Sequence, residues 1–167
     1  KNGITLEVKV SAGSLQNIER LKSDEAQVAF VQGGVVPPKE DPDAEDESGL
    51  LSLGSVFYEP VWVFYRGEKN LTRLTELQGK RIAIGQEGSG VRQLAQQLLS
   101  ANDIPAGDHL VPLGGLKAAE ELQQGRIDAA FIIAAETAPV VQVLIRSPGV
   151  KLMSFAQDRA YQRRFPF

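Results

Sequence analysis

The clearest chemical motif in this chain is a glycine-serine turn between a strand and a helix, within Ile82-Ala-Ile-Gly-Gln-Glu-Gly-Ser-Gly-Val-Arg92. A helix that begins at Gly88-Ser89-Gly90 offers free backbone N–H groups and the positive end of its dipole to an anion. Glycines let the backbone approach that anion closely, the Ser89 hydroxyl adds a donor, and Arg92 can pair bidentately with a carboxylate. The same residues also fit a plain capped helix after a tight turn, so both interpretations stay open.

A second glycine-serine turn, Ser11-Ala12-Gly13-Ser14, repeats this theme near the start of the chain. It can present a second set of donors across a cleft. The competing interpretation is simple capping of the next helix by Ser14, which we favour slightly on residue type. Asn17 stands three residues on, where a capping box would place Glu or Gln.

The turn at Gly13-Ser14 begins a segment that recurs later in the chain. Residues 13–31 align without a gap with residues 114–132, at a shift of 101 positions, and six of the nineteen pairs are identical. Each copy reads as glycine turn, short amphipathic helix, polar turn and apolar strand, which is a helix-then-strand unit of an α/β layer. A shift of this length predicts two α/β lobes rather than a solenoid, and two lobes form a cleft.

Several other chemistries lack their residues. The glycines at 85, 88 and 90 do not follow the dinucleotide order, and a Gly-Lys-Ser/Thr sequence is absent. There are no cysteines, and the single histidine, His109, precedes a strand without an obvious serine partner, so we expect a surface histidine. No basic cluster alternates with aromatics, which argues against nucleic-acid binding.

Residues 37–48 hold six acidic residues against Lys39 and two prolines at their start, so we expect a mobile surface loop. A metal role for Asp41, Asp43 and Glu45 is disfavoured, because the glycine turn and terminal glutamate of a calcium loop are missing. We expect no metal and no cofactor.

Periodicity and turn signals predict the elements that position these residues. The expected strands are 4–10, 29–31, 61–65, 80–85, 109–113, 129–133 and 150–155, and the expected helices are 15–21, 71–79, 91–101 and 138–146. The first forty residues then form a strand-helix-strand crossover, and residues 80–155 form a β-α-β-α-β-α-β lobe. Among the aromatic residues at 58–65, Tyr58 is the best ligand candidate, because Glu59-Pro60 places it at the edge of a strand.

Composition is that of a soluble globular protein, with 43% hydrophobic and 23% charged residues. No apolar run approaches the roughly 20 residues that span a bilayer. The chain begins with Lys1 and shows no signal-peptide pattern, so we expect that any targeting segment was removed or never included. The lack of cysteine fits an extracytoplasmic bacterial protein and many cytosolic proteins alike.

An ordered set of short motifs runs through nearly the whole chain: Gly13-Ser14-x-x-Asn17, Ala29-Phe-Val-Gln32, Tyr58-Glu59-Pro60, Leu77-x-Gly-Lys-Arg-Ile-Ala-Ile-Gly85, Gly88-Ser-Gly-Val-Arg92 and Gly125-x-Ile-Asp-Ala-Ala-Phe131. In this order they resemble the TAXI family of TRAP-transporter solute receptors, which are two-lobed periplasmic binding proteins. No single motif is specific; the ordered set carries the resemblance.

The resemblance implies capture, outside the cytoplasm, of a small carboxylate or amino acid, such as a glutamate-like compound, and its delivery to membrane permease subunits. It implies a type II periplasmic-binding-protein-like α/β fold, with parallel-sheet lobes covered by helices on both faces. The ligand contacts it implies are Gly13, Ser14, Asn17, Gln32, Tyr58, Gly88, Ser89, Gly90 and Arg92.

The chain departs from the family pattern in ways that shape the expected domain organisation. The family's first strand would precede Lys1 and its last strands would follow Phe167, so we expect an incomplete first lobe. We assign 1–60 to that lobe, 61–79 to a crossover and hinge, 80–156 to the second lobe, and 157–167 to the return. The stretch at 134–139 replaces a more glycine-rich turn, and the acidic loop resembles an insertion.

Two other functions fit the same fold. One is a ligand sensor tethered to a membrane-bound signalling protein, which a kinase or cyclase domain after residue 167 would indicate. The other is an enzyme such as a dehydratase, for which only Glu59, Glu87 or Glu136 could supply a catalytic acid or base. We favour the transport receptor over both.

Overall fold

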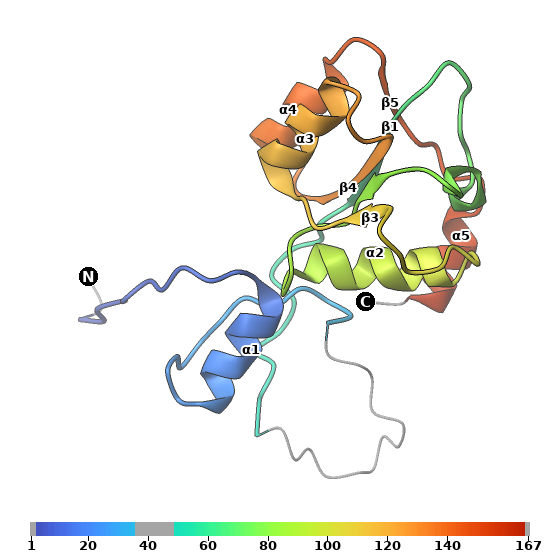
Figure 1. Ribbon diagram of the computed structural model, residues 1–167. Helices are drawn as coiled ribbons and strands as arrows, with labels where there is room; N and C mark the ends of the chain where they lie inside the picture. Colours follow the sequence, from blue (N-terminus) through green and yellow to red (C-terminus); the bar gives the residue numbers. More distant parts are fainter. Residues whose placement is uncertain (1–2, 36–48, 166–167) are drawn as a thin grey trace.

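The computed structural model describes residues 3–35 and 49–165. The acidic stretch at 37–48, with the disfavoured metal hypothesis, lies outside the described residues. Figure 1 shows a sheet with helices packed around it, and a smaller N-terminal part that holds a single helix. We call residues 61–165 the sheet domain, and residues 3–35 with 49–60 the N-terminal part.

The sheet domain contains one five-stranded sheet within the described residues, in the order β3-β2-β4-β1-β5. The strands β2, β3 and β4 are parallel to one another, whereas β1 lies antiparallel between β4 and β5. The strands are β1 (Val61–Arg66), β2 (Ile82–Ala83), β3 (Leu110–Val111), β4 (Ala129–Ile133) and β5 (Val150–Leu152). The helices are α1 (Ser14–Lys22), η1 (Leu74–Leu77), α2 (Gly90–Ser100), α3 (Gly115–Gln123), α4 (Pro139–Ile145) and α5 (Asp158–Arg164).

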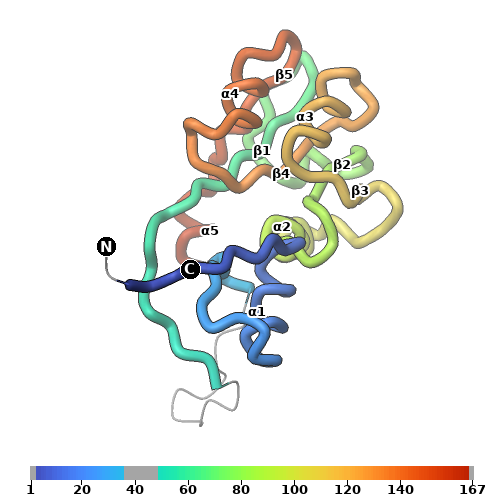
Figure 2. Tube along the Cα trace, turned by 90° about the vertical axis from the view of Figure 1, so that its left-hand side faces the viewer, coloured from blue at the N-terminus to red at the C-terminus, as the bar shows by residue number. Residues whose placement is uncertain are grey.

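Two hydrophobic cores lie on opposite faces of this sheet. Successive residues of β4 alternate between them, because neighbouring side chains of a strand point to opposite faces: Phe131 joins the core under α2, while Ile132 joins the core under α3 and α4. Figures 1 and 2 show α2 and α3 on different sides of the sheet. This arrangement explains why β4 is apolar at every position.

The predicted β-α-β-α-β-α-β order of residues 80–155 is confirmed, from β2 through α2, β3, α3, β4 and α4 to β5. Two local predictions were wrong. The helix expected at 71–79 is only the four-residue 3-10 turn η1, and Gly79 follows it with a positive φ of 73°. The closing helix α5 was missed because its sequence is mostly polar; it is anchored by Tyr161, which donates to Asn102 Oδ1 and packs against Phe155.

The strands predicted at 4–10 and 29–31 were also wrong. Neither segment has strand structure, and the apolar residues of the first are exposed, from 78% at Ile4 to 89% at Val10. A period-two pattern forms a strand only when another backbone pairs with it, and no described segment pairs with these residues. The predicted strand-helix-strand crossover is therefore reduced to α1 between two extended segments.

The two copies of the repeat consequently differ in structure. Both begin at a glycine that precedes a helix, Gly13 before α1 and Gly114 before α3. The second copy continues into the buried strand β4, where Phe131 is 1% exposed, whereas its counterpart Phe30 is 73% exposed. The repeated sequence thus encodes a strand in only one of its two settings.

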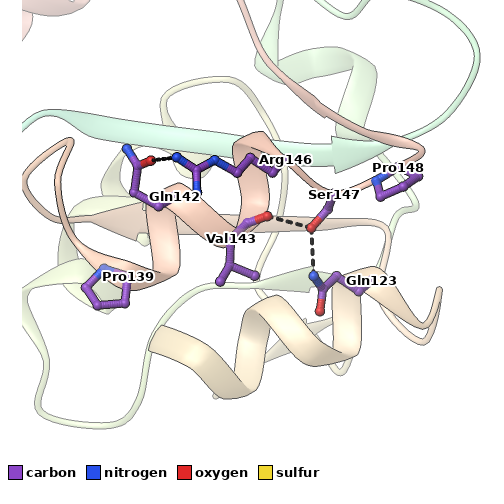
Figure 3. A pocket seen from close by; sticks show the side chains of 7 residues that line it. All are labelled: Gln123, Pro139, Gln142, Val143, Arg146, Ser147 and Pro148. Carbon is purple, nitrogen blue, oxygen red and sulfur yellow. Dashed lines mark hydrogen bonds between the residues drawn. The ribbon is translucent and has the colours of Figure 1, made fainter.

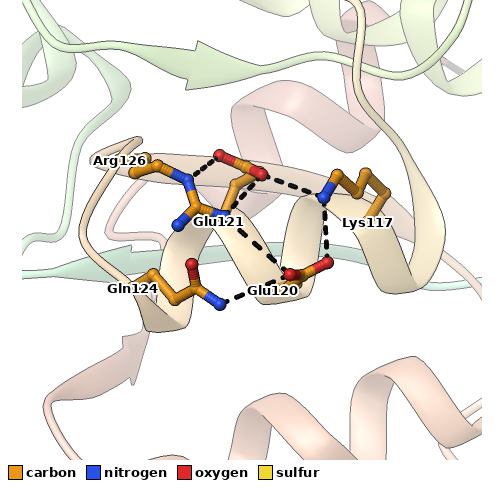
Figure 4. A network of polar contacts seen from close by, with 5 residues as sticks. All are labelled: Lys117, Glu120, Glu121, Gln124 and Arg126. Atoms are coloured by element: carbon orange, nitrogen blue, oxygen red, sulfur yellow. Dashed lines mark hydrogen bonds and ion pairs between the residues drawn. The ribbon is translucent and has the colours of Figure 1, made fainter.

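The outer surface of α3 carries a network of charged side chains (Figure 4). Lys117 contacts Glu120 and Glu121 at 2.9 and 3.2 Å, and Arg126 pairs with Glu121 through both its Nε and Nη2 atoms. The hydrogen bonds from Arg126 are the main cause that lowers the pKa of Glu121 from 4.5 to about 2. Glu121 therefore stabilises the folded chain only while it is ionised.

Replacing Glu121 with glutamine should make the free energy of unfolding depend less on pH in the acidic range. Because the pKa of Glu121 is lower in the folded chain, its stabilisation is complete above pH 4.5 and is lost as the pH falls towards 2. Denaturant titrations from pH 7 to pH 2 should show the wild type and Glu121→Gln converging in this window. Glu136→Gln, which alters an exposed carboxylate without an ion pair among the described residues, should run parallel to the wild type; if Glu121→Gln also does, the network contributes nothing.

Candidate functional site

The glycine-serine turn singled out in the sequence lies at the carboxyl end of β2. From β2 the chain passes through α2 to β3 on one side, and from β3 through α3 back to β4 on the other side of β2. The two helices cover opposite faces, so β2 is the point at which the winding direction of the sheet reverses. In open α/β sheets, ligands bind at this type of switch point, outside the carboxyl ends of the strands.

Ser89 caps α2 and uses its hydroxyl twice. The oxygen accepts a hydrogen bond from the Arg92 amide at 3.3 Å, and the hydroxyl donates to the Gln86 carbonyl at 2.7 Å. Gly85 makes this turn possible: its φ is +92°, and a Cβ there would lie 2.8 Å from Ser89 Oγ. The capped-helix interpretation is therefore correct for Ser89, and its hydroxyl reaches an outside anion only if the Gln86 bond breaks.

Other donors at this turn stay free. The backbone amides of Gly90 and Val91 form no hydrogen bond with any residue of the described ranges. Arg92, in the first turn of α2, has a fully buried Nη1 atom that finds no partner in those ranges either. A cation at a helix N-terminus lies at the unfavourable end of the helix dipole, and buried charges are normally paired. Among the described residues, no carboxylate forms an ion pair with Arg92, not even Glu87 in the adjoining turn.

The N-terminus of α1 lies directly against this turn. The Leu15 amide donates to the Gly88 carbonyl at 3.3 Å, so the two glycine-serine turns are in backbone contact. Gly13 makes the contact possible, since a Cβ there would lie 2.9 Å from both Gly88 O and Ser89 Cα. In this structure the two turns are in direct contact and do not present their donors across an open cleft.

Ser14 and Gln32 extend the contact. The N-cap of α1 is Gly13, not Ser14 as expected; the buried Ser14 hydroxyl instead accepts a hydrogen bond from the Gln32 amide at 3.0 Å. The Gln32 side chain packs against Gly90, where a Cβ would lie only 1.9 Å from Gln32 Oε1. Six of the nine residues expected at the site are consequently brought together: Gly13, Ser14, Gln32, Gly88, Ser89 and Gly90.

Two expected residues have other surroundings. Asn17 uses its side-chain amide to donate to the Phe30 carbonyl at 2.9 Å, which ties α1 to the segment that follows it. Tyr58 is 94% exposed and makes no hydrogen bond or ring contact within the described chain. Neither contributes a polar group to the junction of the two turns in this structure.

Sequence reasoning missed two residues at the junction and misjudged a third. The Gln93 amide donates to the carbonyl of buried Val35 at 3.0 Å, which joins α2 to the N-terminal part a second time. Glu59, considered only as a catalytic group, accepts a hydrogen bond from Gln32 Nε2 at 3.1 Å. Gln93 lies four residues after Ser89, one helical turn on, and this spacing could have indicated that it faces the junction. Its partner Val35 could not be predicted, because it bonds through its backbone carbonyl.

Two hollows of the sheet domain lie away from this junction. One of about 440 Å³ is formed by the ends of α3 and α4, where Gln123 Nε2 donates to Ser147 Oγ and Arg146 bonds to Gln142 (Figure 3). The other lies beside Arg66, whose guanidinium donates to the Gln123 carbonyl at the end of α3. The side chains of Gln123, Gln142, Arg146 and Ser147 in the first hollow, and of Arg66 in the second, all take part in hydrogen bonds. Among residues 3–35 and 49–165, no three acidic, histidine or cysteine side chains gather as metal ligands, and no helix is long and apolar enough to cross a bilayer.

The fold is mixed α/β, with a parallel-rich sheet into which one antiparallel strand is inserted, and it is similar to that of periplasmic binding proteins. Residues 1–164 match the NMT1-like family, so the chain belongs to this family.

Solved structures with a similar fold include three binding or sensor proteins. An ancestral arginine-binding protein bound to glutamine has 23% identity and a TM-score of 0.43, over 58% of this chain and 40% of that one. The periplasmic aliphatic sulphonate binding protein SsuA from Escherichia coli has 20% identity and a TM-score of 0.47, over 64% of this chain and 40% of that one. A histidine kinase sensor domain similar to periplasmic binding proteins has 17% identity and a TM-score of 0.41, over 57% of this chain and 41% of that one. The chain spans about 40% of the length of these structures.

Gly13→Ala should separate the two turns. The added methyl group would clash with Gly88 O and Ser89 Cα, so the contact has to open. Hydrogen exchange followed by mass spectrometry should then show the Leu15 amide exchanging at least about tenfold faster, a loss of roughly 1.4 kcal/mol of protection. Gly54→Ala is the matched control, because Gly54 also has a positive φ but no atom within 4 Å of a Cβ. Equal exchange at Leu15 in both variants would contradict the contact.

Proposed function

We propose that this chain is the ligand-binding part of an extracytoplasmic solute receptor that captures a small carboxylate or amino acid and passes it to the membrane permease subunits of a TRAP-type transporter. Membership of the NMT1-like family and the periplasmic-binding-protein-like fold support a binding role. The ordered motifs that resemble the TAXI family support the transporter type. A tether to the membrane through other segments is compatible with this role.

The observation that carries the proposal is the unpaired positive charge at the α2 N-terminus. Arg92 Nη1 is buried without a partner in the described ranges, and the neighbouring Gly90 and Val91 amides are free. A ligand carboxylate would pair with the guanidinium and accept the backbone donors, so it would satisfy three groups at once. It would also offset the unfavourable position of a cation in the first helical turn.

Ligand capture would use the mobility of the junction. The N-terminal part meets α2 through few contacts, chiefly Leu15 to Gly88, Gln32 against Gly90, and Gln93 to Val35. In this proposal the two turns move apart to admit the ligand and close on it, and the ligand stabilises the closed state by the contacts that it makes only there. Residues near the start of β1, where the chain passes from one part to the other, would act as the hinge.

The proposal is for binding without catalysis. The three carboxylates considered as catalytic groups, Glu59, Glu87 and Glu136, are all exposed, and none is paired with a histidine or lysine in the described structure. Among the described residues of the junction, the Ser14 and Ser89 hydroxyls bond only to backbone groups, so neither is paired with a base as covalent catalysis would require.

Arg92→Ala should weaken binding of the carboxylate ligand by about 1.5–3 kcal/mol, the range for a hydrogen bond to a charged group. Titration calorimetry on the full-length protein with L-glutamate measures this loss. Arg146→Ala removes an exposed arginine directly after α4 and should leave the affinity unchanged. If Arg92→Ala binds as tightly as Arg146→Ala, Arg92 has no part in ligand recognition.

A further inference from the structure

The carboxylate of Glu59 lies beside the anion-binding turn. Gln32 connects the two: its Nε2 atom donates to Glu59 Oε2 at 3.1 Å, and the same amide group packs against Gly90, the first residue of α2. Glu59 is therefore one glutamine amide away from the free donors of the helix. Its sequence position, directly before β1, keeps it next to the junction when the chain enters the sheet.

The charge of Glu59 has no partner within the chain as described. None of the ion pairs among residues 3–35 and 49–165 involves this carboxylate, and its recorded hydrogen bond comes from an uncharged amide. Gln32 holds the carboxylate in place, since the Ser14 hydroxyl accepts from the Gln32 backbone while the side chain is packed on Gly90. The junction thus offers a positioned negative group close to a positive one.

We propose that Glu59 is the specificity residue that selects amino acids over simple carboxylates, by accepting a hydrogen bond from the ligand's ammonium group. This proposal rests on the proposed binding function. The carboxylate of an α-amino acid would bind Arg92 and the amides of α2, and its ammonium group, one carbon away, would face Glu59. A carboxylic acid without the amine would leave Glu59 unpaired and bring a second negative charge near it, which disfavours its binding.

Glu59 and Gln32 have different roles in this proposal. Glu59 would contact the ligand, whereas Gln32 acts as a positioning residue through its amide. Glu59→Gln removes the charge and keeps a side-chain oxygen that can accept from Gln32, so the local structure is retained. Glu59→Asp keeps the charge on a shorter side chain and serves as the conservative variant.

The test is titration calorimetry on the full-length protein with amino acids and their counterparts without the amine, L-glutamate with glutarate and L-aspartate with succinate. We expect the wild type to favour the amino acid of each pair that it binds. Glu59→Gln should lose affinity for the amino acid by about tenfold or more and change its affinity for the amine-free acid by less than about twofold. Glu59→Asp should keep part of the preference, and Glu136→Gln should keep all of it.

Any other result of these titrations would contradict either the specificity role of Glu59 or the proposed binding function. Equal losses for both ligands of a pair would show that Glu59 only supports the structure. A gain in affinity for both would show that Glu59 serves as an internal counter-charge for the α2 N-terminus. A wild type that binds the amine-free acids as well as the amino acids would overturn the specificity role alone. A wild type that binds neither class would overturn the proposed function with it.

Discussion

The close backbone contact between Gly13 and Gly88-Ser89 is the constraint on which the rest of the candidate site depends. It brings the N-termini of α1 and α2 together, although they come from parts of the chain about 75 residues apart. Any side chain at position 13 would prevent this approach, and any side chain at position 85 would distort the turn that presents Ser89. Glycine is required at both positions by geometry, because each combines a positive φ with a close neighbour.

This contact has an electrostatic consequence. Two helix N-termini that meet end to end both present positive partial charge, and Arg92 adds a full charge to the same region. The described carboxylates near this region are Glu87, directly before Gly88, and Glu59, which accepts a hydrogen bond from Gln32. Neither forms an ion pair with Arg92, so a ligand carboxylate could still pair with its guanidinium. This unpaired guanidinium is the physical reason for preferring a binding role over a purely structural one for the two turns.

The sequence predicted the sheet domain well because its signals are local and its partners are also in the chain. The apolar run at 129–133 predicted β4, and the glycine turns at 88–90 and 114–115 predicted where α2 and α3 begin. The antiparallel insertion of β1 between β4 and β5 could not be read from the sequence, since alternation and strand length do not state which neighbour a strand selects. The site was predicted in part: the two turns were identified from glycine and serine spacing, whereas Gln93 to Val35 involves a backbone carbonyl and is invisible to residue type.

The failure of the N-terminal strand predictions shows what a β pattern does and does not determine. Residues 4–10 alternate as regularly as any strand in the chain, yet every apolar side chain of that face is exposed. The pattern specifies which face would be buried if a sheet formed, but pairing needs a second backbone at about 4.8 Å, and no described segment lies in that position. The same holds for Phe30 against Phe131, identical in the repeat and opposite in burial. The sheet domain therefore provides one wall of the candidate site, and the N-terminal part meets it through the Leu15–Gly88 and Gln93–Val35 hydrogen bonds and the packing of Gln32 on Gly90.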